Sequence, residues 1–273
     1  MDIFFLQDTA PDVPHAPEGR YLLVESHGCT LFGRVMLPAF YDEDSRCPVV
    51  MMLHGHPGGD KNLDIAKVLQ NNGFAVAVFS YRGVWGSHGD YSMSHNIEDT
   101  IVVAAYLREN AAKYRIDPER LYLFGHSMGG FSAMNAIACG LKVSGAVLLA
   151  PYDAGYQYLY NRTNFDSVMA CKREGYFRLA SENALEEDGA AHAEAWYFSN
   201  LLPKLDKNIP YCFISGERDT TSQRTEPFVA QMEEAGFKVS HVMLDDGHMF
   251  PRHRASLAKI TLDFFSKAEQ ERT

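Results

Sequence analysis

Short apolar runs alternate with helix-like segments along most of the chain, and this alternation constrains the fold more than any other feature. Residues 48–53 (PVVMML) and 74–80 (FAVAVFS) are almost continuously apolar, as expected for strands that are covered on both faces of a parallel sheet. Residues 63–72 between them have helical periodicity and end at Asn72-Gly73, a common helix stop. Strands that alternate with helices in this way predict an α/β protein with a doubly wound sheet.

We expect eight strands in a mostly parallel sheet. Residues 21–26 and 30–37 are joined by a short turn at His27-Gly28-Cys29, which predicts an antiparallel hairpin at the start. The other strands are expected at residues 120–124, 143–150, 210–215 and 239–244. Further helices are expected at residues 97–114, 128–139, 225–235 and 253–268.

Residues 151–207 break the alternation, because they contain no strand-like run and many aromatic side chains. A segment of this length is too long for a plain loop, so we expect a helical cap there. Residues 1–150 and 208–273 then form the α/β body, which is the predicted catalytic domain. Because the insertion follows the sixth strand, we expect both of its ends at the carboxyl edge of the sheet.

Composition excludes several classes of partner. The 273 residues suffice for one core, and they carry a net charge of −10 with the lysines and arginines scattered. Nucleic acids and anionic membranes need a concentrated basic patch, so neither is expected as a partner. No apolar run reaches the roughly 18 residues of a membrane-spanning helix. The first residues also lack the basic region of a signal peptide. Whether the chain forms a homo-oligomer is left open.

The cysteines are typical of a reducing compartment. They are odd in number, far apart and never in a CxxC pair: Cys29, Cys47, Cys139, Cys171 and Cys212. Neither a disulfide framework nor a zinc site has the spacing that it requires. We therefore expect buried thiols, a cytoplasmic location, and no metal or other cofactor.

The segment GHSMGG, residues 125–130, is the strongest functional signal. It directly follows a predicted strand and opens a predicted helix. A serine on such a tight turn has a strained backbone, and its neighbours must be glycine to avoid clashes. The turn presents the hydroxyl at the carboxyl edge of the sheet, beside the free N–H groups of the helix. Ser127 is therefore the predicted nucleophile; the alternative is a glycine-rich turn in an inert protein.

A nucleophilic serine needs a base, and the base needs an acid that orients it. In this architecture the two follow the serine in the order Asp, His, each beyond a later strand. Asp219 follows the strand at 210–215, and His248 follows the strand at 239–244. We therefore assign Asp219 as the acid and His248 as the base. The alternatives are Glu217 and Asp153 for the acid, and His253 and His241 for the base.

The oxyanion that forms during acyl transfer needs two backbone N–H donors. Met128, directly after the nucleophile, supplies one. The other is expected from the loop HGHPGG, residues 54–59, which follows the third strand. Pro57 has no N–H, so His56 is the best candidate and Gly55 the second. The side chain of His54 is expected to hydrogen-bond within its own loop. His54, His56 and His126 have no companion carboxylate or cysteine at metal-ligand spacing, so no metal site is expected.

The motifs HGHPGG, SYRGVWGSHGDYS, GHSMGG, GERD and DDGHMF together resemble the α/β-hydrolase superfamily. They are most similar to its prolyl-oligopeptidase-like and dienelactone-hydrolase-like serine esterases. The resemblance covers almost the whole chain outside the cap. It implies a cofactor-free Ser–His–Asp hydrolase that uses Ser127, His248, Asp219, His56 and Met128. The chain has no room for the propeller of true oligopeptidases, at least four blades of about 40 to 50 residues, which argues against peptide cleavage.

These observations favour a carboxylic-ester hydrolase that acts on a small-molecule ester. The aromatic cap predicts a bulky apolar or aromatic group in the pocket, lined by Tyr156, Tyr160, Trp196 and Phe198. The first alternative is an aminopeptidase or amidase with the same triad. In that case the acidic run Glu186-Glu187-Asp188 could bind the amine of the substrate. Transfer of the acyl group to another acceptor is also open. A non-catalytic binding module is the remote alternative, because it would be expected to lose the serine or the histidine.

Overall fold

The protein is described here by a computed structural model that covers residues 13–170, 174–221 and 223–272. Eight strands form one sheet in the order β1-β2-β4-β3-β5-β6-β7-β8. The strands are β1 (Glu18–Ser26), β2 (Cys29–Leu37), β3 (Cys47–Leu53), β4 (Ala75–Phe79), β5 (Ile116–His126), β6 (Gly145–Leu149), β7 (Pro210–Gly216) and β8 (Lys238–Leu244). The pairs β1–β2 and β2–β4 are antiparallel, and all the others are parallel. The predicted eight-stranded, mostly parallel α/β fold is confirmed.

Helices cover both faces of the sheet. The main ones are α1 (Leu63–Asn71), α2 (Met93–Glu109), α3 (Met128–Ala138), α8 (Thr225–Glu234) and α9 (Arg254–Gln270). In β3, which is buried throughout, Val50 and Met52 pack with α1 and α9 on one face, whereas Val49 and Met51 belong to the core on the other face, with α2 and α3. This two-sided burial is the reason why the central strands read as continuous apolar runs.

Several element boundaries differ from those expected: β1 begins at Glu18 and α2 ends at Glu109, for example. Two of the differences have a clear local cause. Helix α2 begins at Met93, four residues before the predicted start, because the Ser92 side chain accepts a hydrogen bond from the backbone N–H of His95 and caps the helix. Strand β5 begins at Ile116 and runs through Pro118. An irregularity in its pairing with β3, between Cys47 and Val49, accommodates the proline.

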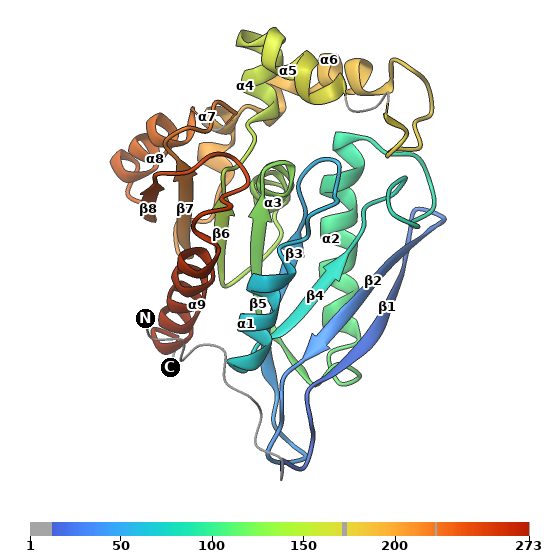
Figure 1. The fold of residues 1–273 in the computed structure, drawn as a ribbon, viewed down its shortest axis with the longest axis vertical. Coiled ribbons are helices and arrows are strands. Elements are labelled where there is room, and N and C mark those ends of the chain that lie inside the picture. The colour runs from blue at the N-terminus through green and yellow to red at the C-terminus, as the bar shows by residue number, and fades with distance from the viewer. Residues whose placement is uncertain (1–12, 171–173, 222, 273) are drawn as a thin grey trace.

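The segment between β6 and β7 contains α4 (Ala154–Tyr160), α5 (Arg162–Met169), α6 (Ala184–Trp196), α7 (Phe198–Leu201) and the 3₁₀ helix η2 (Leu202–Lys204). Figure 1 shows α4, α5 and α6 together at one end of the molecule, beyond the end of α2. The expectation that both ends of this insertion lie at the carboxyl edge is wrong. Strands β6 and β7 are parallel, so β7 begins at the opposite edge, and α7 and η2 run back along α3 to reach it.

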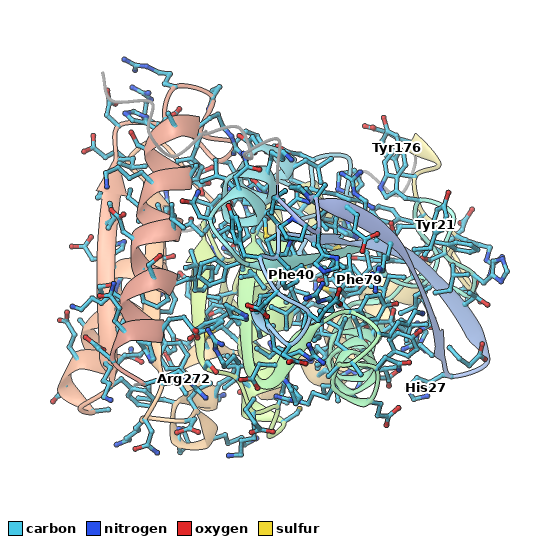
Figure 2. All side chains as sticks on the ribbon, turned by 90° about the horizontal axis from the view of Figure 1, so that it is seen from below. Tyr21, His27, Phe40, Phe79, Tyr176 and Arg272 are labelled. Carbon is cyan, nitrogen blue, oxygen red and sulfur yellow. The ribbon has the colours of Figure 1, made fainter. Side chains whose placement is uncertain are left out.

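Most large side chains lie inside the molecule, but some aromatic ones do not. Figure 2 shows Phe40 and Phe79 within the body, where both are buried, and Tyr21 and Tyr176 at its periphery. The exposed Tyr21 belongs to the outer strand β1. Tyr176 belongs to the insertion and, as described below, lines a cavity.

Candidate active site

Ser127 lies on the sharp turn between β5 and α3. Its backbone has φ 55° and ψ −117°, a strained conformation for a residue with a side chain. Glycine is needed on both sides. A Cβ at Gly125 would lie 2.5 Å from the backbone oxygen of Gly129, and one at Gly129 would lie 1.9 Å from the backbone oxygen of Leu53. The turn predicted from GHSMGG is thus held by close backbone packing, which explains the spacing of the glycines.

His248 and Asp219 come together beyond the ends of β8 and β7. Nδ1 of His248 lies 2.8 Å from Oδ2 of Asp219. The Asp219 side chain is only 1% exposed, whereas that of His248 is 28% exposed. A buried carboxylate that accepts from Nδ1 fixes the ring orientation and leaves Nε2 free to face a substrate or a nucleophile. The two residues that were predicted to act as acid and base thus lie within hydrogen-bond distance of each other.

The alternative acids and bases have other partners or positions. Glu217 is exposed. Asp153 is buried and accepts hydrogen bonds from the backbone N–H groups of Tyr156 and Phe198. His253 lies 2.9 Å from Asp246, and His241 lies 3.0 Å from the hydroxyl of Ser215. Of these candidates, the pair His248–Asp219 therefore fits the required arrangement best.

Thr221 adds a contact that the sequence reading missed. Its hydroxyl oxygen lies 2.6 Å from Oδ1 of Asp219 and 2.8 Å from Nδ1 of His248. Its backbone N–H also donates to Oδ1 of Asp219, at 2.8 Å. Thr221 therefore holds the acid in place and touches the base. Only the sequence separation of two residues from Asp219 could have suggested it, since a threonine can hydrogen-bond an aspartate two positions earlier.

The loop at residues 54–59 lies against the nucleophile. A Cβ at Gly55 would lie 3.1 Å from the Cβ of Ser127, so a side chain here would be accommodated only if its neighbours shifted. The ring of His54 donates from Nδ1 to the carbonyl of Gly55 at 2.8 Å, a bond within its own loop as expected. The backbone N–H groups of His56 and Met128, on either side of Ser127, remain the predicted oxyanion donors.

The side chain of His56 is fixed by aromatic packing. Its ring stacks on Phe177 with centroids 4.4 Å apart, and Phe177 stacks in turn on Tyr91 at 4.5 Å. Nδ1 of His56 also lies 3.0 Å from the hydroxyl of Tyr91. Since Phe177 belongs to the insertion, this stack ties the insertion to the loop that carries the predicted oxyanion donor.

Three histidines around Ser127 are held neutral. Burial lowers the pKa of His54 to about 3 and the pKa of His56 to about 3. Burial, helped by the nearby His248, lowers the pKa of His126 to about 4. The ring of His126, the residue before Ser127, lies next to that of His248, with centroids 5.2 Å apart, and its Nε2 donates to the backbone carbonyl of His248 at 3.1 Å.

Ser127 and His248 open into one cavity of about 410 Å³. Its wall includes the loop 55–60, Trp85, Glu174, Tyr176 and Met249. The sequence did not single out these side chains as pocket residues. Trp85 could have been suspected as a pocket residue from sequence. In the run GVWG a large aromatic residue stands among smaller ones, and the run follows a strand that ends at the carboxyl edge of the sheet.

The four aromatic residues predicted to line the pocket lie elsewhere. Trp196 is buried against Phe131, and Phe198 is buried against Phe228. Tyr156 and Tyr160 contact one another and Tyr197. None of the four is in the wall of the cavity at Ser127 as far as the described residues define it. Trp196 and Phe198 are buried, whereas Tyr160 is 63% exposed. Helical periodicity could not tell which surface each of these rings faces.

The acidic run also has internal partners. Asp188 accepts hydrogen bonds from the backbone N–H and the hydroxyl of Ser94, in the first turn of α2. Glu186 accepts from the hydroxyl of Tyr158 at 2.9 Å and pairs with Arg162 at 2.6 Å. These contacts join the insertion to α2 and brace it internally, so two of the three carboxylates already have a structural role.

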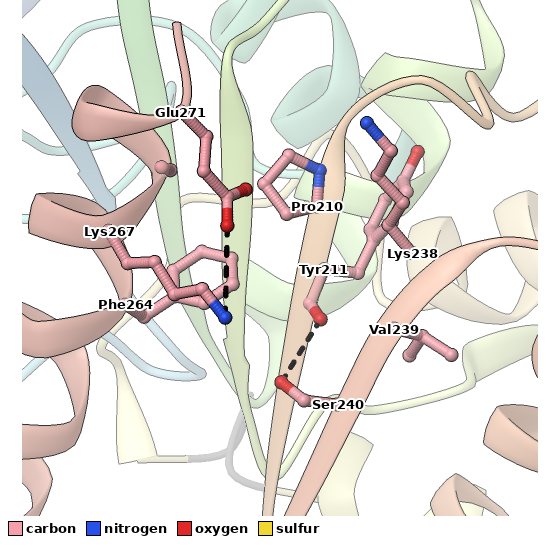
Figure 3. A pocket seen from close by; sticks show the side chains of 9 residues that line it. Pro210, Tyr211, Lys238, Val239, Ser240, Phe264, Lys267 and Glu271 are labelled. Atoms are coloured by element: carbon pink, nitrogen blue, oxygen red, sulfur yellow. Dashed lines mark hydrogen bonds and ion pairs between the residues drawn. The ribbon is translucent and has the colours of Figure 1, made fainter.

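A second cavity of similar size lies at the other edge of the sheet. It is lined by the first residues of β7 and β8 and the last turns of α9, including Pro210, Lys238, Phe264 and Lys267. Figure 3 shows the contacts within it, from Lys267 to Glu271 and from Ser240 to Tyr211. Because β7 and β8 run parallel away from it, this cavity is distant from Asp219 and His248, which follow their other ends.

Over residues 13–170, 174–221 and 223–272, no three His, Cys, Asp or Glu side chains are grouped so as to hold a metal ion. Within the same ranges no helix has the length and apolar character needed to cross a membrane. Cys29, Cys47, Cys139 and Cys212 are free thiols, and Cys171 lies outside the described residues.

A doubly wound sheet with a serine on a strained strand-to-helix turn, and a His–Asp pair beyond two later strands, is the arrangement that defines the α/β hydrolases. The chain belongs to the alpha/beta hydrolase family, whose model matches residues 50–260.

Similar proteins include hydrolases of several kinds. The chain is 34% identical to "Lysophosphatidylserine lipase ABHD12" of Danio rerio over 93 residues, which is 33% of this chain and 23% of that protein. It is 34% identical to "Liver carboxylesterase B-1" of Rattus norvegicus over 110 residues, 37% of this chain and 20% of that protein. The matched stretches thus span only about a quarter or less of these relatives. Among solved structures, the dipeptidyl peptidase 4 of Porphyromonas gingivalis superposes with a TM-score of 0.69 at 17% identity, over 92% of this chain and 36% of that chain.

Proposed function

We propose that the protein is a serine hydrolase that cleaves carboxylic esters through an acyl-enzyme. The observation that carries this proposal is the His248–Asp219 pair at 2.8 Å, whose histidine opens into the same cavity as Ser127 on its strained turn. The similarity to a lipase and a carboxylesterase, both named for ester substrates, supports the choice of an ester.

The chemistry follows from these positions. The Ser127 oxygen attacks the carbonyl carbon while Nε2 of His248 takes the hydroxyl proton, and Asp219 stabilises the imidazolium that forms. The backbone N–H groups of His56 and Met128 are the proposed donors to the oxyanion. When the tetrahedral intermediate collapses, His248 gives the proton to the departing alcohol. A water molecule then attacks the acyl-enzyme with His248 as base, which releases the acid and restores Ser127.

The neutral histidines fit this scheme. A buried His126 that stays uncharged beside His248 does not repel the imidazolium, which a second charged ring would destabilise. The free thiols fit a reducing compartment, so we propose the cytoplasm as the site of action.

A direct comparison of substrates tests the proposal. p-Nitrophenyl esters of increasing acyl length release p-nitrophenolate, and aminoacyl p-nitroanilides release p-nitroaniline. Both products are coloured, so one absorbance assay covers both bond types. We expect kcat/KM for the best ester to exceed that for the best anilide by at least about 100-fold, or 2.7 kcal/mol. Preference for anilides would instead support an amidase or aminopeptidase. Turnover of neither class, in a folded protein, would favour the binding-module alternative.

A further inference from the structure

The cavity at Ser127 is lined by unusually exposed apolar side chains. Trp85 is 48% exposed, Tyr176 is 41% exposed and Met249 is 46% exposed. Large apolar surface that gathers in a concave site, instead of being scattered, marks a place where a ligand binds. The feature is independent of Trp196 and Phe198, the buried aromatic residues of the insertion that were predicted to line the pocket.

Trp85 is held against the loop at residues 54–59, which borders Ser127. Its indole Nε1 donates to the carbonyl of Pro57 at 2.7 Å. A Cβ at Gly58 would lie 2.9 Å from this Nε1, so the indole rests on the glycine backbone. Trp85 also has φ 46°, a left-handed backbone that is costly for an aromatic residue and that clusters at binding sites. A strained residue with an anchored, half-exposed ring offers a preformed surface.

Tyr176 extends this surface from the insertion. Its ring stacks near that of Trp85, with centroids 6.0 Å apart and planes inclined by 28°. The next residue, Phe177, forms an antiparallel bridge with Val84, and the N–H of Arg178 donates to the carbonyl of Gly83 at 2.8 Å. The two ring-bearing segments are therefore held together by backbone contacts, and the rings form one wall. At 6.0 Å there is no space for a third ring between them, so a flat group that binds in this cavity can stack only on the outer face of one ring, next to the edge of the other.

We propose that the Trp85–Tyr176 wall, with Met249 beside the base, binds a flat aromatic group of the ester substrate. An aromatic face gains from stacking on aromatic side chains beyond its burial, which an alkyl chain of equal area does not. The aromatic group belongs either to the acyl part or to the alcohol part of the ester. This inference rests on the proposed ester-hydrolase function and names the substrate class of the same site.

Matched ester pairs test the wall by selectivity. Methyl benzoate against methyl butyrate probes the acyl part, and phenyl acetate against ethyl acetate probes the alcohol part. We expect Trp85→Ala and Tyr176→Ala to lower the aryl-to-alkyl ratio of kcat/KM by about tenfold in one of the two pairs, mainly through KM. Trp85→Phe should retain most of the ratio. Tyr21→Ala, an exposed tyrosine on β1, is the control and should change nothing. An unchanged ratio in both pairs, or an equal change in the control, would overturn the proposal.

A binding measurement separates this inference from the proposed function. The chain has two tryptophans, of which Trp85 is in the wall and Trp196 is buried. In Ser127→Ala, methyl 4-nitrobenzoate should quench tryptophan fluorescence saturably, and Ser127→Ala/Trp85→Phe should lose this saturable phase. Labelling of wild-type Ser127 by a fluorophosphonate without saturable quenching would reject the wall and keep the hydrolase. Saturable quenching without labelling would reject the hydrolase and keep an aryl-binding cavity.

Discussion

The hydroxyl of Thr221 lies 2.8 Å from Nδ1 of His248, so a threonine shares the ring nitrogen that the acid Asp219 holds. The same hydroxyl lies 2.6 Å from Oδ1 of Asp219. When the hydroxyl donates to that oxygen, its own lone pair can accept from Nδ1–H alongside the carboxylate. Thr221 thus holds the carboxylate of Asp219 and favours the tautomer of His248 that carries its proton on Nδ1. The three side chains form one hydrogen-bonded group.

Replacing Thr221 with valine removes this hydroxyl and keeps the shape. A hydrogen bond to a charged group contributes about 1.5 to 3 kcal/mol, so we expect kcat to fall about 10- to 100-fold with KM nearly unchanged. Thr221→Ser should restore most of the rate. A steady-state comparison across pH gives the second readout, because a less firmly held base should also shift the pH profile of kcat/KM. Equal rates for valine and threonine would show that Asp219 alone suffices.

Asp219→Asn should be far more damaging, because an amide at this position favours the wrong tautomer of the histidine. We expect kcat to fall by roughly 10⁴ while the fold is kept. Glu217 is exposed in the same loop, so Glu217→Gln serves as the matched control and should retain nearly full activity. The acid assignment is wrong if the order of the two effects is reversed.

Acid should destabilise the protein in a defined pH window. The pKa values of His54 and His56 are lowered to about 3 and that of His126 to about 4, against 6.5 for a free histidine. Below pH 6.5 the unfolded chain therefore binds protons that the folded protein excludes. The free energy of unfolding falls as the pH drops from 6.5 toward 4, by up to about 1.4 kcal/mol per pH unit for each ring.

Burial raises the pKa of Asp153 to about 7 and also raises the pKa of Asp99, so these two carboxyl groups oppose the trend. Burial lowers the pKa of His241, which adds to the effect of the other three histidines. Urea unfolding at pH 7.5, 6.5, 5.5 and 4.5 measures the slope. His126→Gln keeps a donor for the carbonyl of His248 and should give a shallower slope than wild type. A flat profile between pH 6.5 and 4.5, or no difference in the variant, would contradict the burial of neutral rings.

The buried aromatic residues of the insertion should contribute to the stability of the fold and not to substrate selectivity. Trp196 packs on Phe131 and Phe198 packs on Phe228, so replacement of either with alanine should lower the free energy of unfolding by about 3 to 5 kcal/mol. The ratio of kcat/KM between aryl and alkyl esters should stay within about twofold of wild type. A shift of selectivity with an unchanged melting temperature would restore these two residues to the pocket.

The body of the fold could be predicted from sequence because its signals are local. Continuous apolar runs identified the central strands, and glycine is required beside Ser127 because a Cβ at Gly129 would lie only 1.9 Å from the backbone oxygen of Leu53. The order Ser127, Asp219, His248 also follows from topology, since each partner comes after a strand of the same parallel sheet. The sequence alone is therefore enough to select these three residues as partners.

The pocket wall could not be predicted in the same way. Trp85 and Tyr176 are 91 positions apart and meet only because residue 177 bridges to Val84. Nothing in the aromatic density of the insertion distinguishes Tyr176 from Trp196, whose ring is buried on α3. The direction of each ring depends on how the insertion packs, including its return along α3 to the start of β7. Tertiary packing, which periodicity does not encode, decided these positions.

The central claim is that Ser127 is the nucleophile of an acyl-transfer reaction, and covalent labelling tests it most directly. Wild-type protein and Ser127→Ala are treated with a fluorophosphonate, digested, and mapped by mass spectrometry, with ester hydrolysis measured before and after labelling. We predict one adduct, on Ser127, with activity lost in proportion to labelling, and neither labelling nor activity above about a hundredth of wild type in Ser127→Ala. An adduct on another residue that accompanies the loss of activity, or substantial hydrolysis by Ser127→Ala, would contradict the account.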